Sequence, residues 1–189
     1  MAAQTREGKK LDRRVVRTRK AIMDAFDHLV MSEDVDKITV SAIAREADID
    51  RKTFYLHYNS IDDLVNYKTE ASLEYVLSAL KERGQNASFD ERIHIALQEA
   101  NVVINREVDV YSRIVSRLSI DQILAYFERA AEPAMEHSGY KLEFIDDPEK
   151  RMRLQFYIAG ALSLYATWLK TGRKEPIEKI SAVIEESIR

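Results

Sequence analysis

Apolar residues recur along this chain mostly three and four positions apart, which is the spacing that one face of an α-helix requires. The clearest stripe lies between residues 13 and 32 and predicts one amphipathic helix. It consists of Val15, Ala21, Ile22, Ala25, Phe26, Leu29 and Val30. The chain has only five glycines and three prolines in 189 residues, which leaves little material for the turns of a β-rich protein. The pattern predicts an all-α fold.

Two short helices joined by a tight polar turn are predicted between residues 39 and 58. Thr39 precedes the first helix and Asp50 the second, and both side chains can accept hydrogen bonds from free backbone N–H groups. Asp48 lies in the turn, at a place where aspartate tolerates a left-handed backbone better than most residues. Phe54 points back to the core. This is the arrangement of a helix-turn-helix, whose second helix enters the DNA major groove.

The second of these helices is rich in side chains that bond phosphate oxygens or base edges. The first twenty residues add eight basic and two acidic side chains, a local charge of +6 in a chain of net charge −3. A basic segment ahead of a helix-turn-helix is typical of a phosphate or minor-groove contact, although residues 1–10 could equally be a solubilising tail. The candidate DNA contacts are Arg14, Arg17, Thr39, Ser41, Arg51, Lys52, Thr53, Tyr55 and His57.

Helix starts and stops are readable beyond residue 59. Serine followed three residues later by an acidic or amide side chain indicates a capped helix start, and proline at the first helical position indicates another. The predicted starts are Ser60, Ser88, Ser119, Asp147-Pro148 and Glu175-Pro176. Gly84 and Gly172 mark helix ends, and residues 139–147 form the one long loop. The helix from Ser60 would run roughly 35 Å, long enough to link two domains.

At the helix-turn-helix the chain resembles the TetR family of bacterial transcriptional regulators. The matching residues are Ile43-Ala44, the run from Thr53 to Tyr58, Ser60, and Asp62 to Leu64. One departure concerns Ile61, since many members have a phosphate-binding lysine just after the serine that opens the fourth helix. The later run from Phe156 to Gly160, followed by Trp168-Leu169, also resembles one TetR subgroup.

The resemblance implies three segments. Residues 1–12 would form a basic arm, residues 13–59 a three-helix helix-turn-helix DNA-binding domain, and residues 60–189 a helical ligand-binding and dimerisation domain. The last two helices are broadly apolar and include small residues that allow close approach, so they would pair with their copies in a homodimer; the alternative is that they form core within one chain. The candidate interface residues are Leu154, Ile158, Ala161, Tyr165, Trp168, Ile180 and Ile184.

The family resemblance also implies an effector pocket among the middle helices, although each candidate could equally be a core residue. The candidates are Tyr75, Leu97, Asn101, Tyr111, Ile114, Leu118, Phe127, Phe156 and Tyr157. Asn101 is a polar amide on an otherwise apolar helix face and would orient a ligand. Because the other side chains are mostly apolar, we expect a small, largely apolar effector.

Metal, cofactor and catalytic sites are not predicted. The chain has no cysteine, and its four histidines lack the spacing of metal ligands. It contains no glycine-rich phosphate loop and no nucleophile motif. No apolar run is long enough to span a membrane and no secretory signal is visible, so we expect a cytoplasmic protein.

The sequence therefore predicts a ligand-responsive DNA-binding transcriptional regulator that binds a palindromic operator as a homodimer and acts as a repressor. Three alternatives remain: a helical protein-interaction module, a regulator that acts as an activator, and an enzyme that uses the central cavity. Salt separates the first alternative from DNA binding, because DNA affinity must fall steeply as the salt concentration rises.

Overall fold

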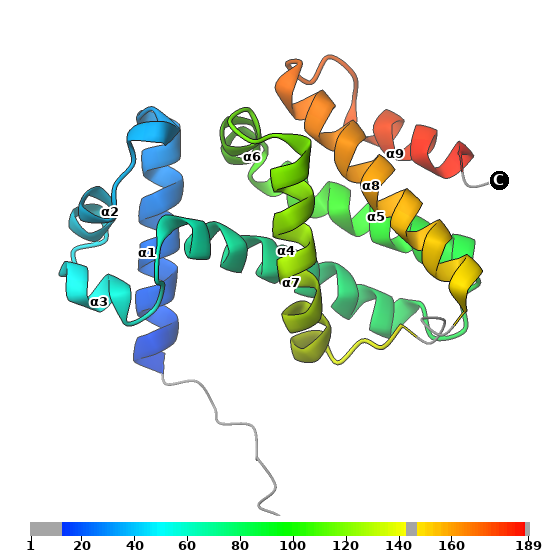
Figure 1. The fold of residues 1–189 in the computed structure, drawn as a ribbon, viewed down its shortest axis with the longest axis horizontal. Coiled ribbons are helices and arrows are strands. Elements are labelled where there is room, and N and C mark those ends of the chain that lie inside the picture. The colour runs from blue at the N-terminus through cyan, green and yellow to red at the C-terminus, as the bar shows by residue number, and fades with distance from the viewer. Residues whose placement is uncertain (1–12, 143–146, 188–189) are drawn as a thin grey trace, which may run out of the picture. The chain divides into compact units, whose positions relative to one another are not determined.

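The computed structural model describes residues 13–142 and 147–187, and all regular elements among them are helices (Figure 1). They are α1 (Arg13–Ser32), the 3-10 turn η1 (Val35–Lys37), α2 (Val40–Glu46), α3 (Arg51–Tyr55), α4 (Ile61–Arg83), α5 (Phe89–Arg106), α6 (Val108–Val115), α7 (Ile120–Ser138), α8 (Pro148–Lys170) and α9 (Ile177–Glu186). The chain divides into two compact units, one ending at Ile61 and one beginning at Asp62. The predicted all-α fold is confirmed.

The first unit is a three-helix bundle around a small apolar core. Its most deeply buried side chains come from all three helices: Ile22, Phe26 and Val30 of α1, Ile43 of α2, and Phe54 of α3. The predicted stripe of α1 therefore faces this core. At the surface, His28 Nδ1 lies 2.7 Å from Glu46 Oε1, which ties α1 to α2.

The turn between α2 and α3 is closed by a left-handed residue. Asp48 has a φ of 52°, and its amide donates to the carbonyl of Arg45 at 3.2 Å. The next amide, that of Ile49, donates to the carbonyl of Ala44 at 2.9 Å. This pair of hydrogen bonds defines a Schellman motif, in which glycine is the usual left-handed residue and aspartate is tolerated. The conformation expected for Asp48 is thus the one observed.

Both helices of the motif begin at the predicted caps. Thr39 Oγ1 accepts a hydrogen bond from the Ala42 amide at 3.1 Å, and Asp50 Oδ1 accepts one from the Thr53 amide at 2.7 Å. The bond from the Thr53 amide is also the main reason that the pKa of Asp50 is lowered. These caps satisfy backbone donors that have no partner inside the helix, so they fix where α2 and α3 start.

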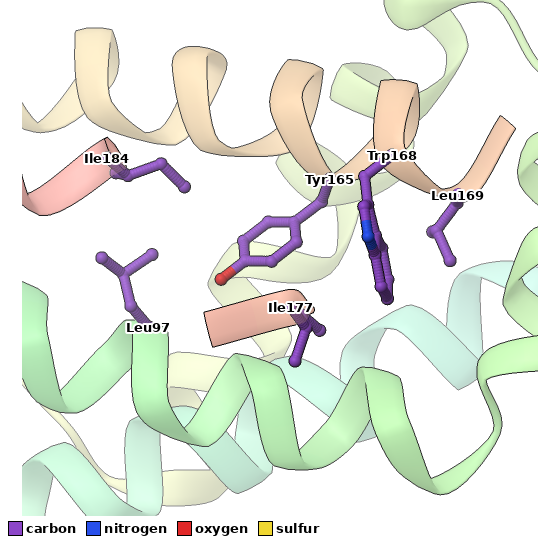
Figure 2. Packing of buried hydrophobic residues seen from close by; sticks show 6 residues of the cluster. All are labelled: Leu97, Tyr165, Trp168, Leu169, Ile177 and Ile184. Atoms are coloured by element: carbon purple, nitrogen blue, oxygen red, sulfur yellow. The ribbon is translucent and has the colours of Figure 1, made fainter. Parts of the chain in front are cut away.

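In the second unit, α5, α8 and α9 share an apolar cluster, drawn in Figure 2. Its buried members are Leu97, Tyr165, Trp168, Leu169, Ile177 and Ile184. The indole Nε1 of Trp168 donates to the carbonyl of Glu175 at 2.7 Å, which secures the connection between α8 and α9. A second cluster lies among α4, α5 and α7 and includes Leu80, Ile95 and Ala134.

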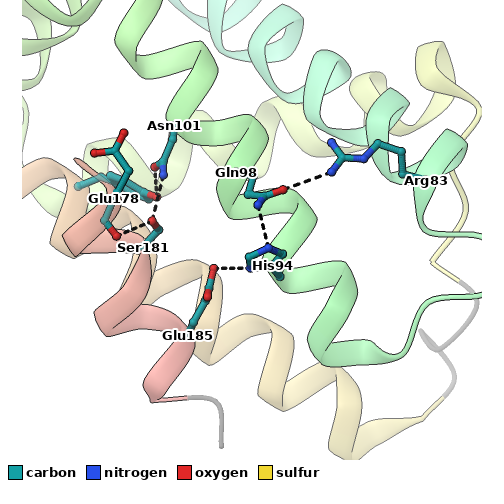
Figure 3. Close-up of polar contacts among 8 residues, drawn as sticks. Arg83, His94, Gln98, Asn101, Glu178, Ser181 and Glu185 are labelled. Atoms are coloured by element: carbon teal, nitrogen blue, oxygen red, sulfur yellow. Dashed lines mark hydrogen bonds and ion pairs between the residues drawn. The ribbon is translucent and has the colours of Figure 1, made fainter. Parts of the chain in front are cut away.

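A polar chain lies beside the first cluster. The hydroxyl of Tyr165 donates to Asn101 Oδ1 at 2.6 Å, and Asn101 Nδ2 donates to Ser181 Oγ at 3.0 Å. Nearer the surface, His94 Nδ1 lies 2.8 Å from Glu185 Oε1, and Figure 3 shows both links between α5 and α9. Burial raises the pKa of Tyr165, so its hydroxyl remains a donor. These bonds set the register of α5, α8 and α9 in a way that apolar contact alone does not.

Most of the helix boundaries predicted for this unit are observed. The boxes of Ser88 with Glu91 and of Ser119 with Gln122 are both complete, and Asp147 caps α8. Two elements were not predicted: η1 has only three residues, and α6 starts without a side-chain cap, so no start signal marks it in the sequence. Pro176 stands one position earlier than expected, as the cap of α9 and not as its first residue.

A buried lysine links α4 to the junction of α5 and α6. Lys68 is 7% exposed, its Nζ lies 2.5 Å from Glu107 Oε2, and it faces the ring of Tyr111 at 5.8 Å. Glu107 occupies the break between α5 and α6, with a φ of −137° and a ψ of 38°. Counting side-chain atoms alone, Glu107 is 43% exposed and Lys68 is 9% exposed. Water therefore reaches the carboxylate more easily than the ammonium group.

This asymmetry gives a stability prediction. Glu107→Gln takes the Glu107 carboxylate away from a buried ammonium group, and we expect the free energy of unfolding to fall by about 2 kcal/mol, less than the roughly 3–5 kcal/mol of a fully buried pair. Lys68→Met keeps an apolar stem and leaves only a hydrated carboxylate, so the expected loss is below about 1 kcal/mol. Urea denaturation followed by circular dichroism measures both values. Equal losses, or a larger loss for Lys68→Met, would contradict this account.

Candidate nucleic-acid interface

The recognition helix α3 is held in the first unit by aromatic side chains. Phe54 is 0% exposed and Tyr58, just after the helix, is 2% exposed. Their ring centroids lie 5.8 Å apart. With this side of α3 buried, the remainder of its surface is left for a partner, and Arg51, Lys52 and Tyr55 are exposed there.

The exposed residues of α3 combine charge with hydrogen-bonding capacity. Lys52 and Arg51 carry cationic groups suited to phosphate oxygens or to guanine acceptors. Tyr55 is packed edge-on against Phe54, with ring centroids 5.6 Å apart, and remains 47% exposed. Thr53 is half-buried, between the two sides of the helix. All four residues were predicted as DNA contacts, and the structure places them in one five-residue helix.

The predicted contacts at the start of α2 are exposed as well. Thr39 and Ser41 both lie on the surface of the first unit. The oxygen of Thr39 accepts the Ala42 amide, which leaves its hydroxyl hydrogen to donate to an outside acceptor such as a phosphate. The capping role and the proposed phosphate contact are therefore compatible in one side chain.

His57, like Thr53, is half-buried, whereas the other predicted contacts are exposed. Loss of hydration lowers the pKa of this histidine, and the nearby positive charge of Arg19 lowers it further. At neutral pH the ring is therefore uncharged, since even the ordinary value lies near 6.5.

Three basic side chains of the first helix lie on its surface. Arg14 and Arg17 are exposed on α1. Lys20 is also exposed and pairs with Asp24 one turn later, at 2.6 Å. The predicted basic arm, residues 1–12, lies outside the described residues.

One exposed residue of this helix was missed by the sequence analysis. Leu56 ends α3 with a helical backbone, and 74% of it is open to solvent. The search for DNA contacts considered only polar side chains, so an apolar one was passed over. The helical period already contains the signal, because residue 56 lies one turn after Lys52, on the same side of the helix.

The predicted effector-pocket residues differ in burial and in the contacts that they make. The amide of Asn101 is engaged by Tyr165 and Ser181, and Tyr111 shares a hydrogen bond of 2.8 Å with Ser72. Leu97 and Ile114 are buried, Leu118, Phe127 and Tyr157 are half-buried, and Tyr75 and Phe156 are exposed. Two open surface hollows of about 500 and 480 Å³ occur in the second unit, and other residues line them.

The predicted dimer residues fall into two groups. Tyr165, Trp168 and Ile184 are buried in the apolar cluster of their own chain. Their burial within one chain favours, for these three residues, the alternative in which the last two helices form core and not a dimer interface. Leu154, Ile158, Ala161 and Ile180 are half-buried.

The described residues contain no group of three or more side chains able to hold a metal ion. Three of the histidines instead pair singly with a glutamate. These pairs are His28 with Glu46, His94 with Glu185, and His137 with Glu70. Within the same residues, none of the helices combines the length and the apolar character that crossing a membrane requires.

Comparison with known proteins agrees with the helix-turn-helix geometry. Residues 22–67 match the family model of bacterial regulatory proteins of the tetR family. YxbF of Bacillus subtilis, an uncharacterised HTH-type transcriptional regulator, is 41% identical over 73 residues, 38% of this chain and 19% of its own length. YvdT of the same organism, also uncharacterised and of HTH type, is 26% identical over 113 residues, 59% of this chain and 58% of its own.

Solved structures extend the likeness in fold to nearly the whole chain. A TetR-family regulator from Streptomyces coelicolor superposes with a TM-score of 0.63 at 21% identity, covering 93% of this chain and 95% of its own. The TetR-family repressor FadR of Thermus thermophilus, solved with lauroyl-CoA, gives 0.58 at 16% identity, covering 90% and 92%. Residues 22–67 therefore match the helix-turn-helix of the TetR family of bacterial transcriptional regulators, and the solved TetR-family structures share the helical fold over nearly the whole chain.

Proposed function

We propose that this regulator acts in the cytoplasm as a homodimeric repressor that binds a palindromic operator and responds to a small ligand. The observation that carries the DNA-binding part is the two-sided α3 helix, with Phe54 fully buried and Lys52 and Tyr55 exposed. A two-fold dimer would present two such helices to successive major grooves, one helical turn or about 34–36 Å apart.

The DNA contacts are tested by substitutions in α3. Lys52→Ala removes a cation and Tyr55→Phe removes one hydroxyl, and each is expected to weaken operator binding by about 1–3 kcal/mol. Fluorescence anisotropy at fixed salt, with an operator selected from random DNA, measures the affinity. Lys174→Ala, an exposed lysine of the second unit, is the matched control and should leave affinity unchanged.

The same assay distinguishes the alternatives. Binding through phosphates must weaken steeply with salt, and the salt slope of Lys52→Ala should be shallower by about one if this lysine contacts a phosphate. Wild-type affinity in both variants would remove α3 from the interface. A protein that binds no DNA sequence selectively would favour the protein-interaction alternative.

The dimer proposal rests on the outer side of α8. Met152 and Phe156, one turn apart, are 62% and 68% exposed, and Leu164 of the same helix is exposed as well. Gly160 continues this side of α8, and a Cβ built there meets nothing within 4 Å. Glycine inside a helix costs about 1 kcal/mol relative to alanine, so an unfilled space at this position suits the close approach of a second chain. We therefore place the seam on the exposed side of α8, with the half-buried Ile158 and Ala161 at its edge.

Charge placed on this seam should separate the copies. Phe156→Glu would bury an unpaired carboxylate between two chains, and we expect the dimer dissociation constant to rise by about a hundredfold or more. Phe156→Leu retains an apolar side chain and is the matched control. Analytical ultracentrifugation at several concentrations gives both constants. A wild-type protein that is monomeric and folded at micromolar concentration would refute the seam directly.

The ligand-response proposal concerns the second unit. FadR of Thermus thermophilus is described in complex with lauroyl-CoA, which favours an effector with a long apolar part for this chain too. Two contacts of α4 support a route for the response. Lys68 ties it to the α5–α6 junction, and Asp62 accepts hydrogen bonds from Tyr126 at 2.5 Å and Arg129 at 2.9 Å, both on α7. A ligand that moves α6 or α7 would therefore act on α4, whose first residue ends the first unit.

An effector that prefers the state unable to bind DNA must change two quantities together. At about one hundred times its dissociation constant it should stabilise the protein by about 2.7 kcal/mol, and it should lower operator affinity. Thermal shift with small apolar molecules and acyl thioesters, followed by anisotropy with operator, measures both. A stabilising ligand that leaves DNA affinity unchanged would mean that this binding is not a switch. A promoter–reporter strain then decides between repressor and activator by the sign of the response.

A further inference from the structure

Leu56 has the highest exposed fraction among the large apolar side chains that the structure describes, 74%. Its amide donates to the carbonyl of Lys52 at 3.1 Å, and its φ of −73° and ψ of −17° continue the helix. The side chain adds almost nothing to the core of the first unit. An apolar group held rigidly at the end of a recognition helix is therefore available to a partner.

The helical period places Leu56 at the outermost line of α3. Successive residues rotate by about 100°, so Lys52 and Leu56 both lie within about 20° of the direction opposite Phe54. Phe54 is fully buried, which fixes that direction toward the outside of the unit. Any partner that lies along α3 meets Lys52 and Leu56 first.

The neighbours of Leu56 decide the chemistry of that partner. The other exposed residues of α3 are Arg51, Lys52 and the hydroxyl-bearing Tyr55. Lysine is depleted in the cores of protein interfaces, whereas cations beside one apolar side chain suit the DNA major groove. On the major-groove edges of the base pairs the only apolar group is the C5 methyl of thymine.

We propose that Leu56 is a specificity-determining residue that packs on the C5 methyl of one thymine in each operator half-site. This inference rests on the proposed DNA-binding function and adds to it a base that the site prefers. Lys52 and Leu56 lie about 6 Å apart along the helix axis, and base pairs are spaced about 3.4 Å apart. The thymine therefore lies within about two base pairs of the place where Lys52 contacts the DNA.

The test removes single methyl groups from the operator. In a series of otherwise identical duplexes, each thymine is replaced in turn by deoxyuridine, which lacks only the C5 methyl. Fluorescence anisotropy with each duplex gives the affinity of the wild-type protein and of Leu56→Ala. Leu56→Met, which keeps an apolar side chain, and Met31→Ala, an exposed apolar residue of α1, serve as controls.

We expect a single deoxyuridine, at one thymine position in either half-site, to weaken wild-type binding about fourfold, the factor for burial of one methyl-sized group. Leu56→Ala removes the contact from both copies, so it should bind the unmodified operator about sixteenfold or more weakly and should lose its sensitivity at that position. Leu56→Met and Met31→Ala should keep the sensitivity. Because Leu56 is exposed, the Leu56→Ala protein should unfold at the wild-type temperature.

Two outcomes would overturn the inference while leaving the proposed function intact. In one, wild-type affinity is unchanged by deoxyuridine at every position. In the other, Leu56→Ala is as sensitive as the wild type, so the methyl is read by another residue. Failure of the wild-type protein to bind any selected operator is a different result, and it would overturn the proposed function and this inference together.

Discussion

The burial of Phe54 is the constraint on which the functional face of this molecule depends. A five-residue helix has too few internal hydrogen bonds to hold itself, so its rotation about its own axis must be set from outside. The Phe54 ring, fully enclosed in the first unit and packed near Tyr58, supplies that constraint. The Schellman turn at Asp48 and the cap at Asp50 fix where the helix begins. Which side chains face outward then follows from the helical period alone.

In the second unit, the two sides of α8 have different environments. One side of this helix contributes Tyr165, Trp168 and Leu169 to the cluster shared with α5 and α9. The other side leaves Met152 and Phe156 uncovered. A helix that is apolar on several sides needs more cover than one chain provides, and the proposed second copy would supply the rest. The polar chain through Asn101 keeps the inner side in register, so the outer side is presented in a defined way.

Local features of this fold were predictable from the sequence, and distant ones were not. The caps at Thr39, Asp50, Ser88 and Ser119 depend on residues three positions away, so single stretches of sequence predict them correctly. The direction of Tyr165 was not predictable, because both sides of α8 carry apolar residues and periodicity cannot decide which side is inside. Asn101 finds its partner eighty residues away, in Ser181, and no local pattern contains that pairing.

The contacts to DNA remain predictions, and they too were selected from local sequence. Arg51, Lys52 and Tyr55 were selected because polar chemistry near a helix-turn-helix is conspicuous, whereas the apolar Leu56 was passed over although the helical period places it on the same side as Lys52. The predicted pocket residues could not be assigned a role from local sequence. Aromatic and aliphatic side chains predict an enclosed space only in general terms, and whether that space is filled depends on packing between helices far apart in the chain.

The exposure of Leu56 also bears on how a regulator of this kind acquires new targets. A side chain that lies outside the core can be exchanged with little effect on the free energy of unfolding, so mutations there escape the stability threshold that eliminates most changes in a small bundle. Lys52 is also exposed and lies on the same side of the helix. Operator preference can therefore diverge among descendants by single substitutions while Phe54 and Tyr58 keep the scaffold unchanged, and the same separation makes these two positions the natural sites for a laboratory library of altered DNA specificity.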